Sequence, residues 1–86
     1  MSKIKERNKL IKEIKEILAE IIDIHENEIS MDSDLINDLG MDSINAVELS
    51  YELNERYGLD IAGQDFKDIN RVEDIVENLN KILHKY

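Results

Sequence analysis

The sequence predicts an all-α fold, a small bundle of three long helices plus one short helix. Two stretches, residues 8–24 and the residues from 70 onward, carry apolar side chains at three- and four-residue spacing. That spacing is the period of an amphipathic helix, and no stretch alternates apolar and polar residues as a half-buried strand does. A chain of 86 residues has one thin core. We therefore expect residues 1–86 to be a single domain, with residues 1–7 a frayed, basic N-terminal extension.

The first helix is predicted over residues 8–24 from one apolar face among lysines and glutamates. Its apolar positions are Ile11, Ile14, Leu18, Ile21 and Ile22. Ile4, Ile11 and Leu18 also fall seven residues apart, which is the spacing of a coiled coil. The pattern stops before three full heptads, so a bundle helix is the favoured interpretation.

Residues 25–42 are predicted to form a long loop, because they are rich in Asp, Asn and Ser and have no sustained period. Loops of this length inside compact domains are uncommon unless they serve a function. We expect Ile29 to pin this loop. A single helical turn should place Leu35 and Leu39 against the core together, with Gly40 ending that turn.

The second helix is predicted to run from Ser43 to Tyr57, where Gly58 supplies the left-handed residue common after a helix. The connector that follows, "LDIAGQDFKDIN", is expected to hold a short helix anchored by Phe66 and Ile69.

The last helix is predicted from Asn70, an N-cap candidate with Glu73 three residues further on. Its apolar stripe consists of Val72, Ile75, Val76, Leu79, Ile82 and Leu83. A stripe of this width seals a helix against the rest of a bundle.

The second helix has two apolar faces. One face holds Ala46, Leu49, Leu53 and Tyr57, which is enough to bury it. The other holds Ile44, Val47 and Tyr51, flanked by Glu48 and Glu55, with Glu52 further round. The second face is either buried in a central helix or exposed for a partner. The two flanking glutamates favour exposure, because burying an unpaired carboxylate is strongly unfavourable.

The net charge of −9 is unevenly distributed, with a basic start in residues 1–15 and an acidic body after it. An acidic body repels nucleic acid and anionic membrane, so we expect neither, and a protein with a basic patch is the predicted partner. The chain has no cysteine, and no apolar run approaches the roughly 20 residues that span a bilayer. We predict a cytoplasmic monomer without stable membrane insertion.

Catalytic and metal-binding residues are not predicted. Ser43 has no visible base or oxyanion hole. The two histidines are interpreted as a charge near the end of the first helix (His25) and a surface residue (His84). Asp32 and Asp34 begin a calcium-loop spacing that the sequence does not continue. Local sequence alone leaves two interpretations. Either Ser43, or Asp42 before it, is only the N-cap of the second helix, or Ser43 is a site that tolerates an attached phosphate ester; the local sequence favours the N-cap.

The segment "DLGMDSINAVEL", residues 38–49, resembles the attachment motif of acyl carrier proteins. The resemblance covers about residues 8–84 and implies an acyl-carrier-like bundle. It implies that a phosphopantetheinyl transferase using magnesium attaches 4′-phosphopantetheine from coenzyme A to Ser43. The arm ends in a thiol that carries acyl intermediates as thioesters, so the missing cysteine is harmless. The chain itself would then be a carrier and not an enzyme.

The resemblance also implies which residues partner enzymes contact. The residues at the matching positions are Asp38, Asp42, Ile44, Val47 and Glu48, and the helical pattern adds Tyr51 and Glu55. Leu49 and Leu53 would face the bundle interior, where carriers can sequester an acyl chain. The expected partners are the transferase and acyl-loading, ketosynthase-type or other biosynthetic enzymes with basic patches.

Some residues depart from the family pattern. Asn45 stands where carriers of fatty acid synthesis usually have Asp, and Tyr51 stands where they often have Met. The connector also lacks the proline that many carriers have just after the position of Ile61. These departures leave fatty acid, polyketide and related specialised pathways open. The alternatives are an aminoacyl or peptidyl carrier of the same fold, or an unmodified acidic helical adaptor in which Ser43 only caps a helix.

Overall fold

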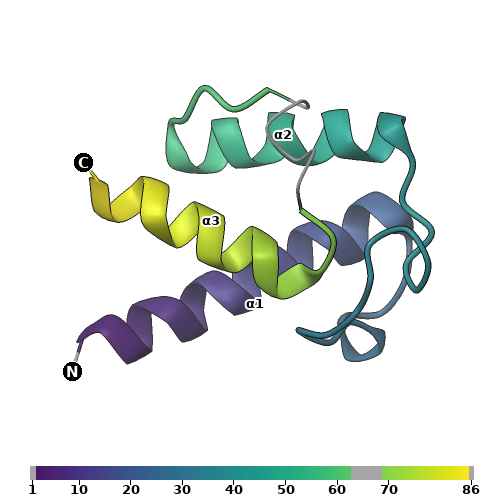
Figure 1. The fold of residues 1–86 in the computed structure, drawn as a ribbon, viewed down its shortest axis with the longest axis horizontal. Helices are drawn as coiled ribbons and strands as arrows, with labels where there is room; N and C mark the ends of the chain where they lie inside the picture. The colour runs from purple at the N-terminus through teal and green to yellow at the C-terminus, as the bar shows by residue number, and fades with distance from the viewer. Residues whose placement is uncertain (1, 63–68, 86) are drawn as a thin grey trace.

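The computed structural model describes residues 2–62 and 69–85, which form a helical bundle (Figure 1). Its elements are α1 (Ser2–Ile22), the short 3₁₀ turn η1 (Glu26–Glu28), α2 (Ser43–Tyr57) and α3 (Val72–Lys85). The strand-like pairing within those ranges is a single isolated bridge between Asp34 and Arg71. The predicted all-α fold is confirmed. No helix in this part of the chain is long and apolar enough to cross a membrane.

Helix α1 begins earlier than predicted, at Ser2 instead of near residue 8, and ends at Ile22. Lysine, arginine and glutamate are good helix formers, so the basic start continues the helix without an apolar face of its own. The end is set by Asp23, whose φ of 56° is left-handed. The N–H of Ile24 then donates to the carbonyl of Ala19 at 3.0 Å, a Schellman-type stop.

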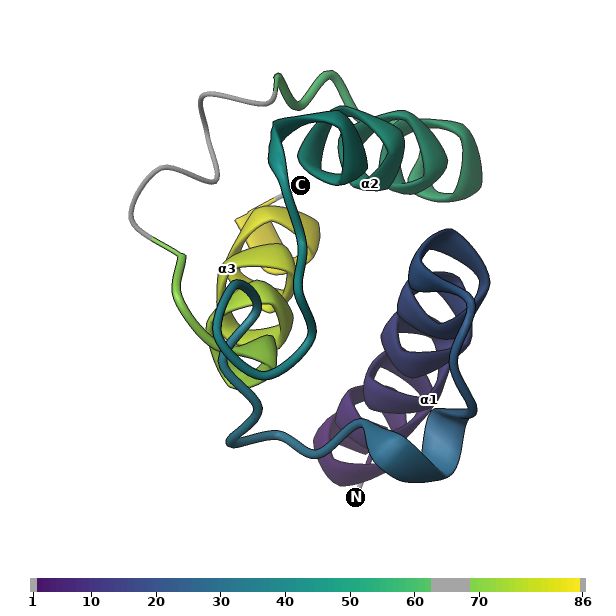
Figure 2. The ribbon, with the colours of Figure 1, turned by 90° about the vertical axis from the view of Figure 1, so that its right-hand side faces the viewer.

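The apolar face of α1 is covered by the same chain. Ile14, Ile17 and Leu18 are buried, and α1 contacts both α2 and α3. Figure 2 shows α3 beside α1 and α2 above the C-terminal turns of α1. The bundle interpretation is therefore confirmed over the coiled coil, because a coiled-coil seam would have left these side chains for a second chain.

The long loop between α1 and α2 is pinned as predicted and also closes the start of α3. Ile29 and Leu35 are buried, and Leu39 packs against the same core. Backbone N–H groups at the start of α3 have no partner inside the helix. Here Val72 N–H donates to the carbonyl of Ser33 at 3.1 Å, and Glu73 N–H to that of Met31 at 3.0 Å. The loop thus supplies acceptors that the helix lacks.

The predicted cap of α3 lies one residue too early. The helix begins at Val72, so Arg71 is the flanking residue instead of Asn70. The side chain that reaches back is that of Asp74, not Glu73, and it accepts from the N–H groups of Arg71 at 3.0 Å and Asn70 at 3.1 Å. The loop carbonyls, which the sequence does not reveal, bond the first turn and shift the boundary.

The core combines residues of all three long helices with loop residues. Its buried members are Leu10, Ile14, Ile17, Leu18, Ile29, Leu35, Met41, Leu49, Leu53, Val72, Ile75, Val76 and Leu79. The predicted stripe of α3 is confirmed, since its first four members are buried and Leu83 packs against the core. The short helix expected around Phe66 lies outside the described residues, whereas Ile69 packs against the core.

The end of α2 is set by local hydrogen bonds, as the sequence predicts. Gly58 adopts a left-handed φ of 64° and its N–H donates to the carbonyl of Asn54. The Asn54 side chain then holds the connector: its Oδ1 accepts from the N–H of Ile61 at 2.7 Å, and its Nδ2 donates to the carbonyl of Ile61 at 2.8 Å. These bonds fold the connector back along α2.

Candidate functional site

Ser43 is the first residue of α2, and it is exposed. The residue that caps the helix is Asp42. Its Oδ1 accepts from the N–H of Asn45 at 2.9 Å, and Oδ1 of Asn45 accepts from the N–H of Asp42 at 3.2 Å. This reciprocal pair is a capping box. None of the hydrogen bonds recorded within residues 2–62 and 69–85 uses the Ser43 hydroxyl, so that hydroxyl is available for chemistry.

The approach to Ser43 is a turn held by side-chain hydrogen bonds. Oδ1 of Asp34 accepts from the N–H groups of Ile36 at 3.0 Å and Asn37 at 2.8 Å. The hydrogen bond from the Asn37 N–H is the main reason why the pKa of Asp34 lies below its usual value. Asp38 closes the same turn, because its Oδ2 accepts from the N–H of Asp34 at 2.7 Å. Met41 is buried just before the cap, which anchors the chain where α2 begins.

The second apolar face of α2 is exposed. Ile44 is 69% exposed, Val47 60% and Tyr51 61%. On the opposite face Leu49 and Leu53 are each only 1% exposed. We call Ile44, Val47 and Tyr51 the exposed strip. Burial on both sides, which the sequence left open, is thereby excluded, and the strip begins directly beside Ser43.

The carboxylates beside the strip are held in place by neutral donors. Asn45 Nδ2 donates to Oε1 of Glu48 at 3.3 Å, and the Tyr51 hydroxyl donates to Oε1 of Glu55 at 3.2 Å. The negative charge of Glu55 is the main cause of the raised pKa of Tyr51. The ion pairs recorded in the described part of the chain join Arg71 to Glu73 and His84 to Glu6. Within that part, the strip's glutamates keep their charge free for a partner.

One exposed apolar residue was missed by the sequence reasoning. Ile36 is 69% exposed, as much as Ile44. The signal was present: once Leu35 and Leu39 share one face of a single turn, the residue next to Leu35 points elsewhere. Ile36 lies in the turn that leads to Ser43.

Among the residues that the structure describes, neither histidine acts as a base for Ser43. His25 lies beyond the end of α1, directly before η1, where its backbone N–H donates to Oε2 of Glu28 at 3.0 Å. His84 lies on α3, with its Nε2 3.7 Å from Oε2 of Glu6. Neither contacts Ser43 through a recorded hydrogen bond. The described residues also contain no group of three or more His, Cys, Asp or Glu that could hold a metal ion.

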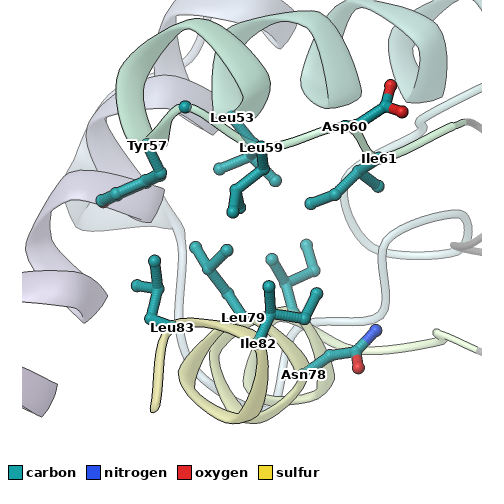
Figure 3. A pocket seen from close by; sticks show the side chains of 11 residues that line it. Leu53, Tyr57, Leu59, Asp60, Ile61, Asn78, Leu79, Ile82 and Leu83 are labelled. Atoms are coloured by element: carbon teal, nitrogen blue, oxygen red, sulfur yellow. The ribbon is translucent and has the colours of Figure 1, made fainter. Parts of the chain in front are cut away.

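A groove of about 780 Å³ lies between α2, the connector after it and α3. Figure 3 shows Leu53, Leu59 and Ile61 on one side, facing Leu79, Ile82 and Leu83 of α3 on the other. The predicted inward direction of Leu49 and Leu53 is confirmed by their burial. Leu53 lines this groove and Leu49 does not. Sequestration of an acyl chain here stays a prediction.

Comparisons with known proteins agree with this geometry. A family model described as "Phosphopantetheine attachment site" matches residues 12–79. An acyl carrier protein of Coprothermobacter proteolyticus is 34% identical over 79 residues, which span 92% of this chain and 96% of that protein. An acyl carrier protein of Clostridium perfringens is 38% identical over 72 residues, spanning 84% of this chain and 95% of that protein.

Two solved structures share the fold. The HMG-ACPI domain of the CurA module from Lyngbya majuscula superposes with a TM-score of 0.79 at 28% identity, covering 90% of this chain and 77% of that one. The apo doublet acyl carrier protein from prodigiosin biosynthesis gives a TM-score of 0.73 at 27% identity. That match covers 86% of this chain and 36% of the doublet.

The matched region includes the capped start of α2, the exposed strip and most of the core. Proteins of this kind hold acyl groups as thioesters on 4′-phosphopantetheine, interact with a phosphopantetheinyl transferase and with biosynthetic enzymes, and are not enzymes themselves. The chain belongs to the acyl carrier protein family, and acyl carriage on this cofactor is its function.

Proposed function

We propose that Ser43 is the residue that carries 4′-phosphopantetheine. The observation that carries the proposal is that Asp42 caps α2, which leaves the exposed Ser43 hydroxyl without an intramolecular role. The first N–H groups of a helix and its dipole favour a negative charge. A phosphodiester on the first residue of α2 is therefore well placed. The family match spans Ser43 and supports the same assignment.

The chain contributes the nucleophile and the surface that the transferase recognises. Ser43 Oγ forms the new bond to the pyrophosphate phosphorus of coenzyme A that bears pantetheine. The bond from that phosphorus to the bridging oxygen breaks, and adenosine 3′,5′-bisphosphate leaves with the bridging oxygen. The serine proton goes to a base of the transferase, because no described residue of this chain forms a recorded hydrogen bond with the Ser43 hydroxyl. When bound, the arm supplies a terminal thiol that holds the acyl group as a thioester. The turn at 34–39 and the buried Met41 keep Ser43 fixed at the helix start.

Intact-mass spectrometry tests this assignment. The apo chain is incubated with coenzyme A, magnesium and a broad-specificity phosphopantetheinyl transferase. The wild type should gain the mass of one phosphopantetheine and Ser43→Ala should gain none. Ser50→Ala is the matched control, because Ser50 is buried on the same helix and its hydroxyl donates to the carbonyl of Val47. Modification of Ser43→Ala would refute the proposal.

We further propose that enzymes dock on the exposed strip and on the acidic residues around it. The docking residues are Asp38, Asp42, Ile44, Val47, Glu48, Tyr51 and Glu55. An apolar strip with free carboxylates suits a partner with an apolar patch rimmed by Lys and Arg. Asp38 joins this set with its carboxylate already bonded to the Asp34 N–H. It contributes charge while holding the turn.

Three substitutions separate docking from folding. Glu48→Lys should lower kcat/KM for modification about tenfold, whereas Glu77→Lys, the same charge change on exposed α3 surface, should lower it less than about twofold. Val47→Ala should impair modification while leaving the urea midpoint unchanged, because Val47 is exposed. Equal effects of Glu48→Lys and Glu77→Lys would mean that enzymes do not read this face.

We assign the carrier to a specialised pathway, fatty-acid-like or polyketide in its chemistry, working in the cytoplasm. Asn45 and Tyr51 depart from the usual residues of fatty acid carriers, and two structural neighbours are carriers named for CurA and for prodigiosin biosynthesis. Complementation of a strain that lacks its fatty acid carrier is the test. Failure to complement, together with full modification in the cell, is expected. Normal growth would instead assign the chain to fatty acid synthesis.

A further inference from the structure

A second groove, of about 480 Å³, lies between α1 and α2. Its lining consists of Ile17, Glu20 and Ile21 from α1 and Val47, Glu48, Tyr51 and Glu52 from α2. Figure 2 shows the C-terminal turns of α1 beneath α2, where these residues come together. Four lining residues carry apolar or aromatic surface, and the other three are glutamates. We call this the α1–α2 groove.

The charge of the α1–α2 groove is not balanced within the described part of the chain. None of its lining residues is basic. The ion pairs recorded there involve Glu73 and Glu6, which lie elsewhere. Glu48 accepts one hydrogen bond from the neutral Asn45 amide. Three carboxylates that line one groove repel one another, and a cation placed among them would relieve that repulsion.

The lining selects among possible occupants. An acyl chain would cover the apolar surface but would desolvate carboxylates without pairing them. A phosphate would be repelled. A bare metal ion would leave the surfaces of Ile21 and Val47 uncovered, and no metal-binding group is present among the described residues. An arginine side chain meets both demands, because its aliphatic stem lies on apolar surface and its planar guanidinium pairs with carboxylates and stacks on an aromatic ring.

Tyr51 adds a reason to prefer arginine. Its hydroxyl donates to Glu55 at 3.2 Å, which restrains the ring while leaving the residue 61% exposed. A guanidinium over a tyrosine face is attracted by the ring's quadrupole. Glu48 and Glu52 lie on the same groove and would pair with the guanidinium edge.

We propose that the α1–α2 groove receives an arginine side chain of the phosphopantetheinyl transferase that modifies the chain. Val47, Glu48 and Tyr51 belong both to the docking surface and to this groove. An enzyme seated on the exposed strip therefore reaches the groove without a second binding event. The recognition surface extends from α2 onto α1, with Glu20 and Ile21 as its new members. The inference rests on the proposed docking face.

The test compares charge changes at Glu20 of α1 with the same changes at Glu48 of α2 and Glu77 of α3. Glu20→Lys should lower kcat/KM for phosphopantetheine transfer about tenfold and Glu20→Gln about threefold, mainly through KM. The reason is that the complex loses the charge pair between Glu20 and the transferase arginine. Glu77→Lys, which makes the same charge change on α3, should stay within about twofold. Glu20 is exposed, so none of these variants should have a urea midpoint below that of the wild type.

The outcomes separate the two proposals. A loss with Glu20→Lys that Glu77→Lys does not reproduce supports the groove. A loss with Glu48→Lys but none with Glu20→Lys overturns the groove and leaves the docking strip standing. No loss with either overturns both. NMR gives a second readout. When the ¹⁵N-labelled chain is titrated with the transferase, the backbone amide resonances of Ile17–Ile21 should shift along with those of α2. Shifts confined to α2 contradict the extension onto α1.

Discussion

At the scale of single residues, the start of α2 divides two tasks between neighbours. Asp42 accepts the N–H of Asn45 and so satisfies the helix end, while Ser43, one residue further on, keeps its hydroxyl exposed. A serine in the capping position would have its oxygen engaged by a backbone N–H. The Asp-Ser order therefore separates stability from reactivity. The Asn45 side chain accepts a hydrogen bond from the Asp42 N–H and donates one to Glu48. A carboxylate in place of Asn45 would repel Glu48.

This division predicts a contrast in stability. Asp42→Ala should lower the free energy of unfolding by about 1 kcal/mol, because the N–H of Asn45 loses its acceptor. Ser43→Ala should change it by less than about 0.5 kcal/mol. Urea denaturation measures both, and Asp42→Asn, which keeps an acceptor oxygen, should recover most of the loss. Equal destabilisation by Ser43→Ala would mean that Ser43 is the cap and that its hydroxyl is not free.

At the scale of elements, two helix ends are bonded to distant parts of the chain: the start of α3 and the end of α2. The loop between α1 and α2 provides carbonyls for the first turn of α3. The end of α2 is tied to α1, because the Tyr57 hydroxyl donates to Oε2 of Glu13. Both residues are half-buried. Isolated helices of this length are marginal in water, so these bonds add to the core packing that stabilises the bundle.

The tie between Tyr57 and Glu13 makes stability depend on alkaline pH. Burial, and then the hydrogen bond to Glu13, raise the pKa of Tyr57 above its ordinary value. The stabilisation by the neutral phenol is fully present below the unfolded pKa of about 10, and it is lost as pH rises toward the higher folded pKa. The urea midpoint of the wild type should therefore fall as pH rises above about 10.

Tyr57→Phe isolates this contribution. At neutral pH it should lower the free energy of unfolding by about 1 kcal/mol, because one partly buried hydrogen bond is lost. Above about pH 10 its urea midpoint should fall less steeply than that of the wild type. Tyr51→Phe, at an exposed position, should keep most of the wild-type fall. An identical pH dependence of Tyr57→Phe and wild type would contradict the role of this bond.

At the scale of the whole molecule, the net charge of −9 acts in two directions. It attracts basic enzymes to the carrier, and it strains the folded chain through repulsion among carboxylates that lie closer together than in the unfolded state. Among the described residues, few of these carboxylates have an ionic partner. The property that steers partners therefore also limits stability.

Added salt should change fold stability and the rate of partner association in opposite directions. Raising ionic strength from about 0.01 M to about 0.3 M shortens the screening length from about 30 Å to below about 10 Å. The urea midpoint should rise, while the association rate with the transferase, measured by stopped flow, should fall about tenfold or more. Glu48→Lys and Glu77→Lys should raise the low-salt midpoint alike, yet only Glu48→Lys should slow association. A midpoint that falls with salt would contradict the self-repulsion.

The predictable parts of the fold are those with local signals. The bounds of α2 match the prediction because Asp42 and Ser43 mark its start and Gly58 its end. The start of α1 and the cap of α3 were misplaced for different reasons. Residues 2–7 are helical although Ile4 is their one apolar side chain, so three- and four-residue apolar spacing could not mark them, whereas their Lys, Arg and Glu are good helix formers. The first turn of α3 is bonded by carbonyls of Ser33 and Met31, far away in sequence.

The sequence by itself determined the all-α class, the acyl carrier motif around Ser43 and the two apolar faces of α2, because period and motif are local properties of the chain. Only the tertiary structure decided which face meets solvent and where α1 lies beside α2. Burial depends on which helices pack together: in the packed bundle Leu49 and Leu53 lie in the core, while Val47 and Tyr51 stay exposed. The α1–α2 groove, built from residues some thirty positions apart, exists only after that packing.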